Sequence, residues 1–340
     1  MSSDTVARPD RALEEFLVTQ GLADAQTPAQ WTALTGGVSS DIWRVCLPGQ
    51  TLCVKRALPQ LKVAREWLAP ITRNAYEWAW LCFAAARLPQ AVPRPIAHDA
   101  EQGILAMAYL DVDSHPVWKQ QLLEGRIDPR MAHTVADLLG QLHSASAHDP
   151  ECAPQFQSSD IFYPIRLEPY LVATGEAHPD LAPTLQALVE RTLATRLALV
   201  HGDISPKNIL AGPQSPIFLD AECAWFGDPA FDLAFCLNHF LLKCLVHRDR
   251  RRDYLHCFAD FTQAYLQRVD WEAPQALESR AAALLPGLFL ARIDGKSPIE
   301  YVTREADKAL VRRVARPLIL TPPPRLAEIA RIWDGALADT

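Results

Sequence analysis

Strand-like and helix-like segments are divided unevenly along this chain, and that division limits the folds it can adopt. Two short runs of β-forming residues, 42–47 and 51–58, flank a Pro-Gly turn and predict a hairpin. A helix is expected over 71–87, and two more strands near 95–98 and 103–110. These segments predict a small sheet accompanied by a helix.

The rest of the chain is predicted to be mostly helical. Proline, with 27 residues, falls mainly between the helical patterns, as a helix-breaking residue should. The expected architecture is an α+β fold of two lobes, a β-rich N-lobe at 1–110 and a larger, mostly helical C-lobe at 111–340. Helices are expected over 129–146, 181–196, 229–246, 254–268, 277–292, 304–320 and 326–337.

Composition excludes several classes of partner. The net charge is −7 and there is no basic tail, so nucleic acid is not an expected partner. The eight cysteines show neither C-x-x-C nor zinc spacing, which indicates free thiols in a reducing cytosol. The first residues lack a signal-peptide core, and the apolar segment 231–246 is too short and too interrupted to span a bilayer. We therefore expect a cytoplasmic protein without a membrane partner.

The segment 199–210, LVHGDISPKNIL, places four chemically capable side chains between apolar ends. Residues 198–203 are expected to end a helix, with a tight turn at Gly202, before a strand resumes at 208–210. This arrangement would present the polar side chains together at a turn.

A second short strand is expected over 215–222. Asp203 and Asp220 would then lie at the ends of adjacent strands, with Asn208 five residues past Asp203. Two carboxylates and an amide oxygen at one place are hard ligands suited to Mg²⁺. A carboxylate without a metal can instead accept a hydroxyl proton.

These residues carry a resemblance to a known family. The chain resembles the aminoglycoside phosphotransferase and choline kinase superfamily, which shares the protein-kinase-like fold, and 227–235 (GDPAFDLAF) matches a further segment of that group. The resemblance implies ATP and Mg²⁺, with Asp203 as the catalytic carboxylate facing the acceptor hydroxyl and with Asn208 and Asp220 holding the metal. The residues that match the HGD…N…D pattern are His201, Gly202, Asp203, Asn208 and Asp220.

Several neighbours of this motif have expected supporting roles. His201 is expected to support the loop by hydrogen bonding, and Asp232 to bond to the loop backbone. Lys207 either touches the γ-phosphate or faces solvent. Asp228 is expected to cap a helix whose first position is Pro229.

A kinase-like N-lobe should supply a lysine on a strand and a glutamate on the following helix. Lys55 fits the first role, and Glu77 is its expected partner because a glutamate among aromatic residues requires pairing; Glu66 is the alternative. In the Gly-Gly turn at 35–41, backbone and hydroxyl groups would bind the nucleotide phosphates. The residues expected there are Gly36, Gly37, Ser39 and Ser40.

The segment ILAMAYLDV resembles the hinge where adenine docks. Met107 would lie behind the base, and backbone groups from Ala108 through Tyr109 to Leu110 would bond its edge. The alternative is an ordinary core strand.

Two features resemble the methylthioribose kinases in particular. One is the D-x-E motif formed by Asp220 and Glu222, and the other is the run from Lys55 to Glu77. Residues two apart in a strand face the same way, so Glu222 is expected to be a further metal or substrate ligand; the alternative is a salt-bridged carboxylate. Asn208 follows the general superfamily pattern instead.

The acceptor site is expected to involve the C-terminal helices. Residues 231–340 hold 16 Lys and Arg against 14 Asp and Glu, which is not the acidic surface that a polycationic aminoglycoside needs. A neutral or anionic hydroxylated metabolite is favoured. Arg292 and Lys296 are the candidate substrate ligands, although Gly295 equally suits a helix C-cap, and Trp225 is either a pocket wall or plain packing.

We therefore predict an ATP-dependent O-phosphotransferase that acts on a small, sugar-like metabolite as a monomer or homodimer. An aminoglycoside phosphotransferase is the alternative substrate assignment. A protein kinase is disfavoured because only eight residues separate Asp220 from Pro229, too few for a peptide-docking loop. A non-catalytic nucleotide-binding protein is disfavoured because Lys55, Asp203 and Asp220 are all present.

Overall fold

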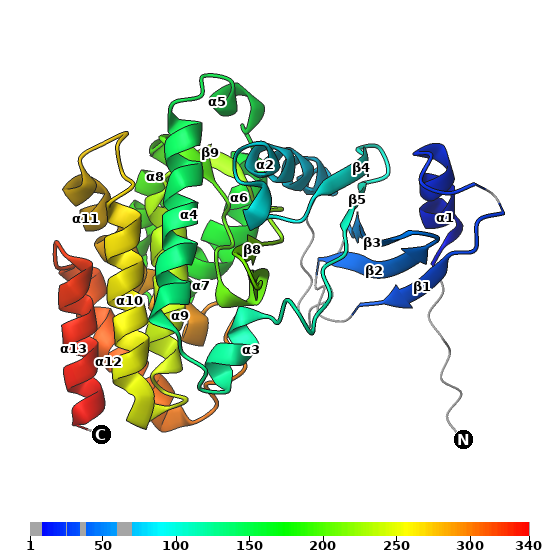
Figure 1. Ribbon diagram of the computed structural model, residues 1–340. Coiled ribbons are helices and arrows are strands. Elements are labelled where there is room, and N and C mark those ends of the chain that lie inside the picture. The colour runs from blue at the N-terminus through cyan, green and yellow to red at the C-terminus, as the bar shows by residue number, and fades with distance from the viewer. Residues whose placement is uncertain (1–8, 25, 35–38, 60–69, 340) are drawn as a thin grey trace. The chain divides into compact units, whose positions relative to one another are not determined.

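The computed structural model describes residues 9–24, 26–34, 39–59 and 70–339 (Figure 1). Internal contacts divide the chain into two compact units, Met1–Ser114 and His115–Thr340, and each is described by itself. The functional lobes 1–110 and 111–340 remain a prediction.

A five-stranded antiparallel sheet forms the N-terminal unit, in the order β1-β2-β3-β5-β4. The predicted hairpin is formed by β2 and β3, where Leu47 pairs with Gln50 across a turn at Gly49, whose φ is +82°. The elements are α1 (Arg11–Thr19), β1 (Gln30–Ala33), β2 (Ser40–Leu47), β3 (Gln50–Ala57), α2 (Arg73–Arg87), η1 (Pro89–Ala91), β4 (Pro95–Asp99) and β5 (Ile104–Ala108).

Alternation along β3 divides its side chains between two environments. Leu52 and Val54 belong to an apolar core that also contains Phe16 of α1 and Trp43 of β2. Because side chains alternate along a strand, Lys55 extends from the opposite face, where it meets α2. The sheet therefore separates its apolar core from a buried charged residue.

The C-terminal unit is mostly helical, as predicted. Among its helices, α4 packs beside α10 (Figure 1), and α9 packs beside α11. Its helices are α3 (Trp118–Leu123), α4 (Pro129–Ala147), α5 (Cys152–Gln155), α6 (Ser159–Phe162), the π-helix η2 (Tyr163–Val172), α7 (Ala173–Ala177), α8 (Ala182–Ala194), η3 (Pro206–Asn208), α9 (Ala230–Lys243), η4 (Arg248–Arg250), α10 (Arg251–Leu266), α11 (Pro274–Asp294), α12 (Glu305–Leu320) and α13 (Leu326–Ala338).

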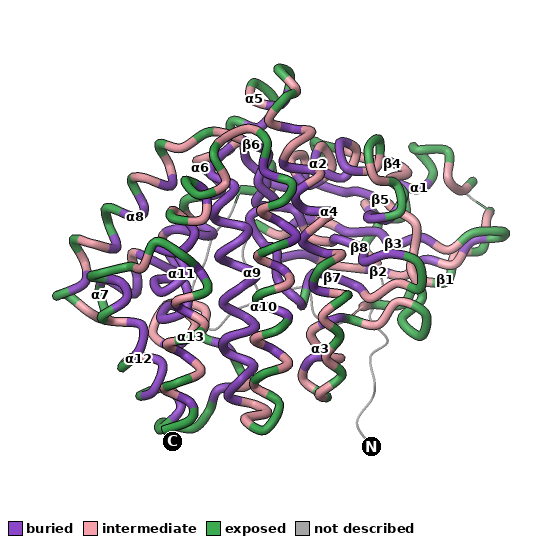
Figure 2. The backbone as a smooth tube through the Cα atoms, turned by 60° about the vertical axis from the view of Figure 1, so that its left-hand side comes forward, coloured by how far each residue is buried: buried purple, intermediate pink, exposed green. Residues whose placement is uncertain are grey.

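Every residue of α9 is buried, as the continuous purple of its tube in Figure 2 shows. A helix that is apolar on all sides belongs in the centre of a domain. Its polar side chains, which include Asp232, His239 and Lys243, are therefore also in the interior.

Two short antiparallel pairs of strands lie in the C-terminal unit. β6 (Ala198–Val200) pairs with β9 (Trp225–Gly227), and β7 (Ile209–Ala211) pairs with β8 (Pro216–Phe218). The prediction that 198–203 ends a helix is wrong: α8 stops at Ala194, and the segment before His201 is a strand. Its neighbour β9, which comes from later in the chain, provides the hydrogen bonds that fix this strand.

All eight cysteines are free thiols. Six of them are buried, and Cys46 and Cys82 are half-buried. Burial raises the pKa of the Cys53 and Cys257 thiols to about 12. Within the described part of the chain, no helix is long and apolar enough to cross a membrane.

Candidate active site

The β7–β8 hairpin brings two of the predicted metal ligands close together along the backbone. Ile209 pairs with Phe218, and the Leu219 amide donates to the Asn208 carbonyl over 2.9 Å. Asn208 therefore lies opposite the residue that immediately precedes Asp220. This is the proximity that the sequence predicted for the two residues.

The conformation at Asp220 differs from the prediction. β8 ends at Phe218, and Asp220 has φ +68°, the single positive φ among described non-glycine residues. Glu222 is buried in a turn that the Ala224 amide closes by donating to the Ala221 carbonyl over 3.0 Å. The strand predicted over 215–222 is therefore confirmed only at 216–218, and the prediction that Asp220 and Glu222 lie on one face of a strand is wrong. A short aspartate tolerates the left-handed region better than most residues.

Gly202 creates the sharp turn before the candidate catalytic residue. Its φ is +80°, and a Cβ at this position would lie 2.8 Å from both the Cβ and the carbonyl oxygen of Cys223. Both the backbone conformation and the close approach therefore require glycine.

Asp203 is 2% exposed, and its two carboxylate oxygens have different surroundings. Oδ2 accepts from Arg166 Nη2 at 2.7 Å and lies 3.1 Å from Lys207 Nζ. Oδ1 is buried and has no hydrogen-bond partner among the described residues. A buried acceptor without a donor is costly, so this oxygen is suited to a hydroxyl group that arrives with a ligand.

Arg166 is buried on η2. Burial disfavours its charged form, but the combined attraction of Asp203 and further acidic groups, among them Glu222, outweighs that effect, and the pKa of the guanidinium is raised. The guanidinium therefore keeps its charge inside the unit, next to the carboxylate that it binds.

His201 supports the loop, as predicted. Its Nε2 lies 3.1 Å from the Leu219 carbonyl, and its Nδ1 accepts from the Asp203 amide at 3.2 Å. A carbonyl can only accept, so Nε2 carries the proton and Nδ1 is occupied as an acceptor. Burial lowers the pKa of His201, which keeps the ring neutral and leaves no free nitrogen to act as a base.

Asp232 binds the backbone of the turn at His201 and Gly202, as predicted. Its carboxylate accepts from the amides of His201 at 2.7 Å and Gly202 at 2.9 Å. It also lies 3.2 Å from His143 Nε2, while Nδ1 of that ring lies 2.7 Å from the Tyr265 hydroxyl. This buried network connects α4, α9 and α10 to the turn.

The helix that Asp228 precedes begins one residue later than expected. α9 starts at Ala230, whose amide donates to the Asp228 carboxylate over 3.0 Å. Arg280 binds the same carboxylate at 3.0 Å and is bridged to Glu272. The contacts assign Asp228 a structural role.

In the N-terminal unit, Lys55 and Glu77 form the expected ion pair. Lys55 Nζ lies 2.8 Å from Glu77 Oε1, and the two residues are 3% and 5% exposed. Glu66, the alternative partner, lies outside the described residues. A buried charged pair of this kind fixes the lysine in one orientation.

The predicted phosphate loop is described only in part. Gly36 and Gly37 lie outside the described residues, whereas Ser39 and Ser40 are buried where β2 begins. The Ser39 carbonyl accepts from Arg73 Nη2 at 2.6 Å, and the same nitrogen donates to the Leu58 carbonyl. Arg73 thus joins the beginning of β2 to the end of β3.

The predicted hinge residues lie at the end of β5. Met107 pairs with Cys53 of β3. The amides of Ala108 and Tyr109 donate to the carbonyls of Arg94 and Thr51, at 2.9 and 3.2 Å. These two amides are therefore engaged within the unit, and the adenine-binding role of this segment stays a prediction.

Three of the predicted substrate residues have different surroundings in the structure. Trp225 is fully buried in β9 and stacks on Phe162, with ring centroids 4.4 Å apart, which favours the packing alternative. Lys296 is exposed and ion-paired with Glu168. Arg292 donates to the Tyr170 hydroxyl at 3.2 Å and to the Ser297 carbonyl at 2.5 Å.

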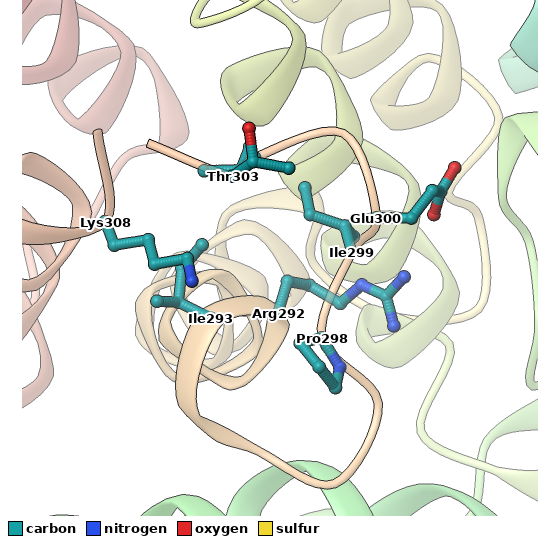
Figure 3. A pocket seen from close by; sticks show the side chains of 8 residues that line it. Arg292, Ile293, Pro298, Ile299, Glu300, Thr303 and Lys308 are labelled. Carbon is teal, nitrogen blue, oxygen red and sulfur yellow. The ribbon is translucent and has the colours of Figure 1, made fainter. Parts of the chain in front are cut away.

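Arg292 also lines a cavity of about 260 Å³ on the C-terminal unit. Figure 3 shows its side chain between Pro298 and Ile299, with Glu300 beyond the guanidinium. Arg292 Nε is buried and has no hydrogen-bond partner among the described residues. Arg292 is thus a predicted acceptor residue that lines a cavity.

The oxygens near the loop fit a magnesium ion that is shared with phosphates. Asn208 Nδ2 donates to the Asp203 carbonyl at 3.1 Å, so its amide oxygen is directed away from that contact. In the described part of the chain, no group of three or more His, Cys, Asp or Glu side chains can hold a metal by itself. Mg²⁺ commonly takes one or two protein oxygens and completes its shell with water and substrate phosphates.

Sequence reasoning missed Arg166 and the whole segment α5–α7 that carries it. The available signal was an arginine between apolar residues, Ile165 and Leu167, in a stretch with two prolines. A charged residue in such a setting indicates a buried partner, but its identity depends on the fold.

Comparisons with known proteins identify what the chain is similar to. The model of the phosphotransferase enzyme family matches residues 30–277. Methylthioribose kinase of Yersinia enterocolitica is 26% identical over 219 residues, which cover 56% of this chain and 54% of that protein. The chain thus spans about half the length of this curated relative, and the expected resemblance to methylthioribose kinases is confirmed.

Solved structures confirm the fold prediction. A choline/ethanolamine kinase family protein from Mesorhizobium loti matches with a TM-score of 0.53 at 17% identity, covering 97% of this chain and 99% of that one. A spectinomycin phosphotransferase in complex with ADP and spectinomycin matches with a TM-score of 0.53 at 13% identity, covering 96% and 99%. At these identities the likeness shows the α+β, protein-kinase-like fold alone.

Proposed function

Because the chain belongs to the phosphotransferase enzyme family, we propose that it transfers the γ-phosphoryl group of ATP to a hydroxyl group of a small, sugar-like metabolite. The observation that carries this proposal is the carboxylate of Asp203. It is buried, one oxygen is fixed by cations, and the other has no donor among the described residues. That oxygen is suited to accept a hydrogen bond from the acceptor hydroxyl.

The reaction needs alignment more than covalent help from the protein. The acceptor oxygen forms a bond to the γ-phosphorus, the bond from that phosphorus to the bridging oxygen breaks, and ADP leaves with the electron pair. The hydroxyl proton passes to Asp203 Oδ1 and then to solvent. In this scheme Asp203 orients the hydroxyl and accepts its proton.

The remaining predicted residues have roles in binding ATP and its metal. Bound Mg²⁺ would neutralise charge on the phosphates, and Asn208 and Asp220 would hold it, with Glu222 as a further metal or substrate ligand. Lys55, fixed by Glu77, would bind the phosphates.

The start of β2 and the end of β5 would contact other parts of the nucleotide. Ser39 and Ser40, with Gly36 and Gly37, would approach the phosphates. Met107, Tyr109 and Leu110 would contact adenine.

A ribose-like sugar is the first acceptor to test. The relatives named methylthioribose kinase and the near-balanced charge of 231–340 support it over a polycationic antibiotic. Arg292, in the last turn of α11, lines a cavity, and Lys296 follows two residues after that helix ends. Free thiols support a reducing compartment, so we place the reaction in the cytoplasm, carried out by a monomer or homodimer.

The experiment is release of ADP from MgATP with a panel of acceptors: methylthioribose, other pentoses, amino sugars, choline, homoserine and aminoglycosides. Asp203→Ala should abolish turnover of the preferred acceptor and leave ATP affinity nearly unchanged, because the lost carboxylate acts on the hydroxyl. Asp160→Asn, at an exposed aspartate of the same unit, is the matched control. Near-normal turnover by Asp203→Ala would contradict the assignment, and turnover of aminoglycosides alone would contradict the acceptor class.

A further inference from the structure

We propose that Arg166 is a positioning residue that sets the orientation of the Asp203 carboxylate, and that the π-helix η2 connects this orientation to the C-terminal end of α11, where Arg292 lies. The inference rests on the proposed function of Asp203 and extends it to a segment that carries no family motif. All the residues involved belong to the C-terminal unit.

Each nitrogen of the Arg166 guanidinium has a different acceptor. Nη2 lies 2.7 Å from Asp203 Oδ2, Nε donates to the Gly202 carbonyl at 2.5 Å, and Nη1 donates to the Ile165 carbonyl at 2.7 Å. The planar group therefore joins the catalytic turn and its side chain to η2 at three points. A lysine, with one nitrogen, cannot reproduce this geometry.

These contacts make the two oxygens of Asp203 unequal. Because Oδ2 is held on one side by Arg166 and on the other by Lys207, rotation of the carboxylate is restricted. Oδ1 is left as the oxygen that can meet the acceptor hydroxyl. Lys207 is half-exposed, so the buried Arg166 provides the firmer of the two contacts.

The widened helix on which Arg166 lies has a local cause. Pro169, inside η2, lacks an amide hydrogen and cannot make the normal helical bond, which disturbs the regular α spacing at this point. Turns of π-helix are frequent at functional sites because they redirect side chains. Here Arg166 and Tyr170, four residues apart, both approach the ring of Phe235.

The C-terminal half of η2 contacts the end of α11 and the segment that follows it. Arg292 donates to the Tyr170 hydroxyl at 3.2 Å, and the Lys296 amide donates to the Pro169 carbonyl at 2.9 Å. Lys296 also pairs with Glu168. One short helix thus contacts both the catalytic carboxylate and the segment predicted to bind the acceptor, so its geometry sets their separation.

The test compares Arg166→Met, Arg166→Lys and the control Arg312→Met. Arg312 is a partly exposed arginine whose ion pairs with Asp294 and Glu305 lie outside the catalytic loop. The probes are MgATP and methylthioribose, or the best acceptor of the panel, and the measured quantities are kcat, both KM values and the melting temperature.

Arg166→Met should lower kcat about 100-fold, the loss expected when a reacting group is displaced by roughly 1 Å, with the KM for MgATP nearly unchanged. Arg166→Lys should recover about tenfold of this loss, because it restores the positive charge but not the several N–H donors of the planar guanidinium. A kcat close to wild type, or an equal loss in Arg312→Met, would overturn the proposal. Loss of activity in Arg166→Met through unfolding is recognised by the melting temperature, and Arg166→Lys then decides.

A crystal structure of Arg166→Met gives a readout that needs no acceptor. We expect the Asp203 carboxylate to turn toward Lys207, and an unchanged carboxylate would overturn the inference. Asp203→Ala distinguishes failure of the proposed role of Asp203 from failure of the positioning role of Arg166. If it retains turnover, the proposed role of Asp203 fails. If it loses turnover while Arg166→Met does not, the positioning role alone fails.

Discussion

Replacing Asp232 by asparagine tests how far the catalytic turn depends on a buried carboxylate behind it. The carboxylate is fully buried and accepts two backbone amides, from His201 and Gly202, on different oxygens. An asparagine has one acceptor oxygen, so whichever way its amide is oriented, an NH₂ group faces a backbone N–H. One buried amide therefore loses its partner.

The size of the effect follows from these contacts. Leaving one buried donor unsatisfied costs about 1–3 kcal/mol, and the remaining bond loses the strength that a charged acceptor gives it, so the free energy of unfolding should fall by about 3 kcal/mol. For a unit of this size, that corresponds to a decrease of about 6–12 °C in the melting temperature.

The assay is thermal unfolding, followed by circular dichroism, together with ADP release on the preferred acceptor. We expect kcat to fall as well, because Gly202 lies directly before Asp203. The exposed Asp160→Asn is the control and should leave both quantities unchanged. A melting temperature within about 2 °C of wild type would refute the reasoning, because a lost buried hydrogen bond cannot be so small.

Three further outcomes are expected. Glu77→Gln should destabilise the N-terminal unit by about 3 kcal/mol and raise the KM for MgATP, because it removes the carboxylate that pairs with the buried Lys55. The control Glu14→Gln, at an exposed position, should do neither. An unchanged KM in Glu77→Gln would count against the role of Lys55. Gly202→Ala should lower the melting temperature and kcat together, since φ +80° costs about 1–2 kcal/mol for alanine before the contact with Cys223 is added; a melting curve equal to wild type would contradict this. Lys243 is fully buried, and burial, together with repulsion by Lys119, lowers its pKa to about 7. The Lys243 amine therefore stays protonated up to a higher pH in the unfolded chain than in the folded one. Lys243→Met should therefore raise the melting temperature relative to wild type at pH 7, and this difference should shrink as the pH rises toward 10; a difference that grows would show that the sign is wrong.

Local patterns predicted those parts of the fold that local physics determines. The hairpin of β2 and β3 follows from alternation around a Pro-Gly turn, and α2 from a helical run of apolar residues. The Lys55–Glu77 pair was expected because a buried carboxylate requires a cation, and in the structure they are 2.8 Å apart. The β7–β8 hairpin was likewise expected from its short strands and turn.

The missed features depend on contacts between distant segments. Arg166 and Asp203 are 37 residues apart, and the local sequence around each residue does not identify the other as its partner. The strand β6 was mistaken for a helix end because its partner β9 comes 25 residues later, and a three-residue strand has no period to detect. The left-handed Asp220 was missed for a different reason, because a local turn at 221–224 follows where the sequence pattern predicted that the strand would continue.

Because the cysteines are free thiols, their alkylation reports when the surrounding parts of the protein unfold. Buried thiols cannot react with alkylating reagents until the chain around them unfolds. Cys53 lies in the N-terminal unit, while Cys152, Cys223, Cys236, Cys244 and Cys257 lie in the C-terminal unit. Pulsed alkylation followed by peptide mass spectrometry would therefore record, in the unmodified protein and without an engineered label, whether the two units open together or one at a time.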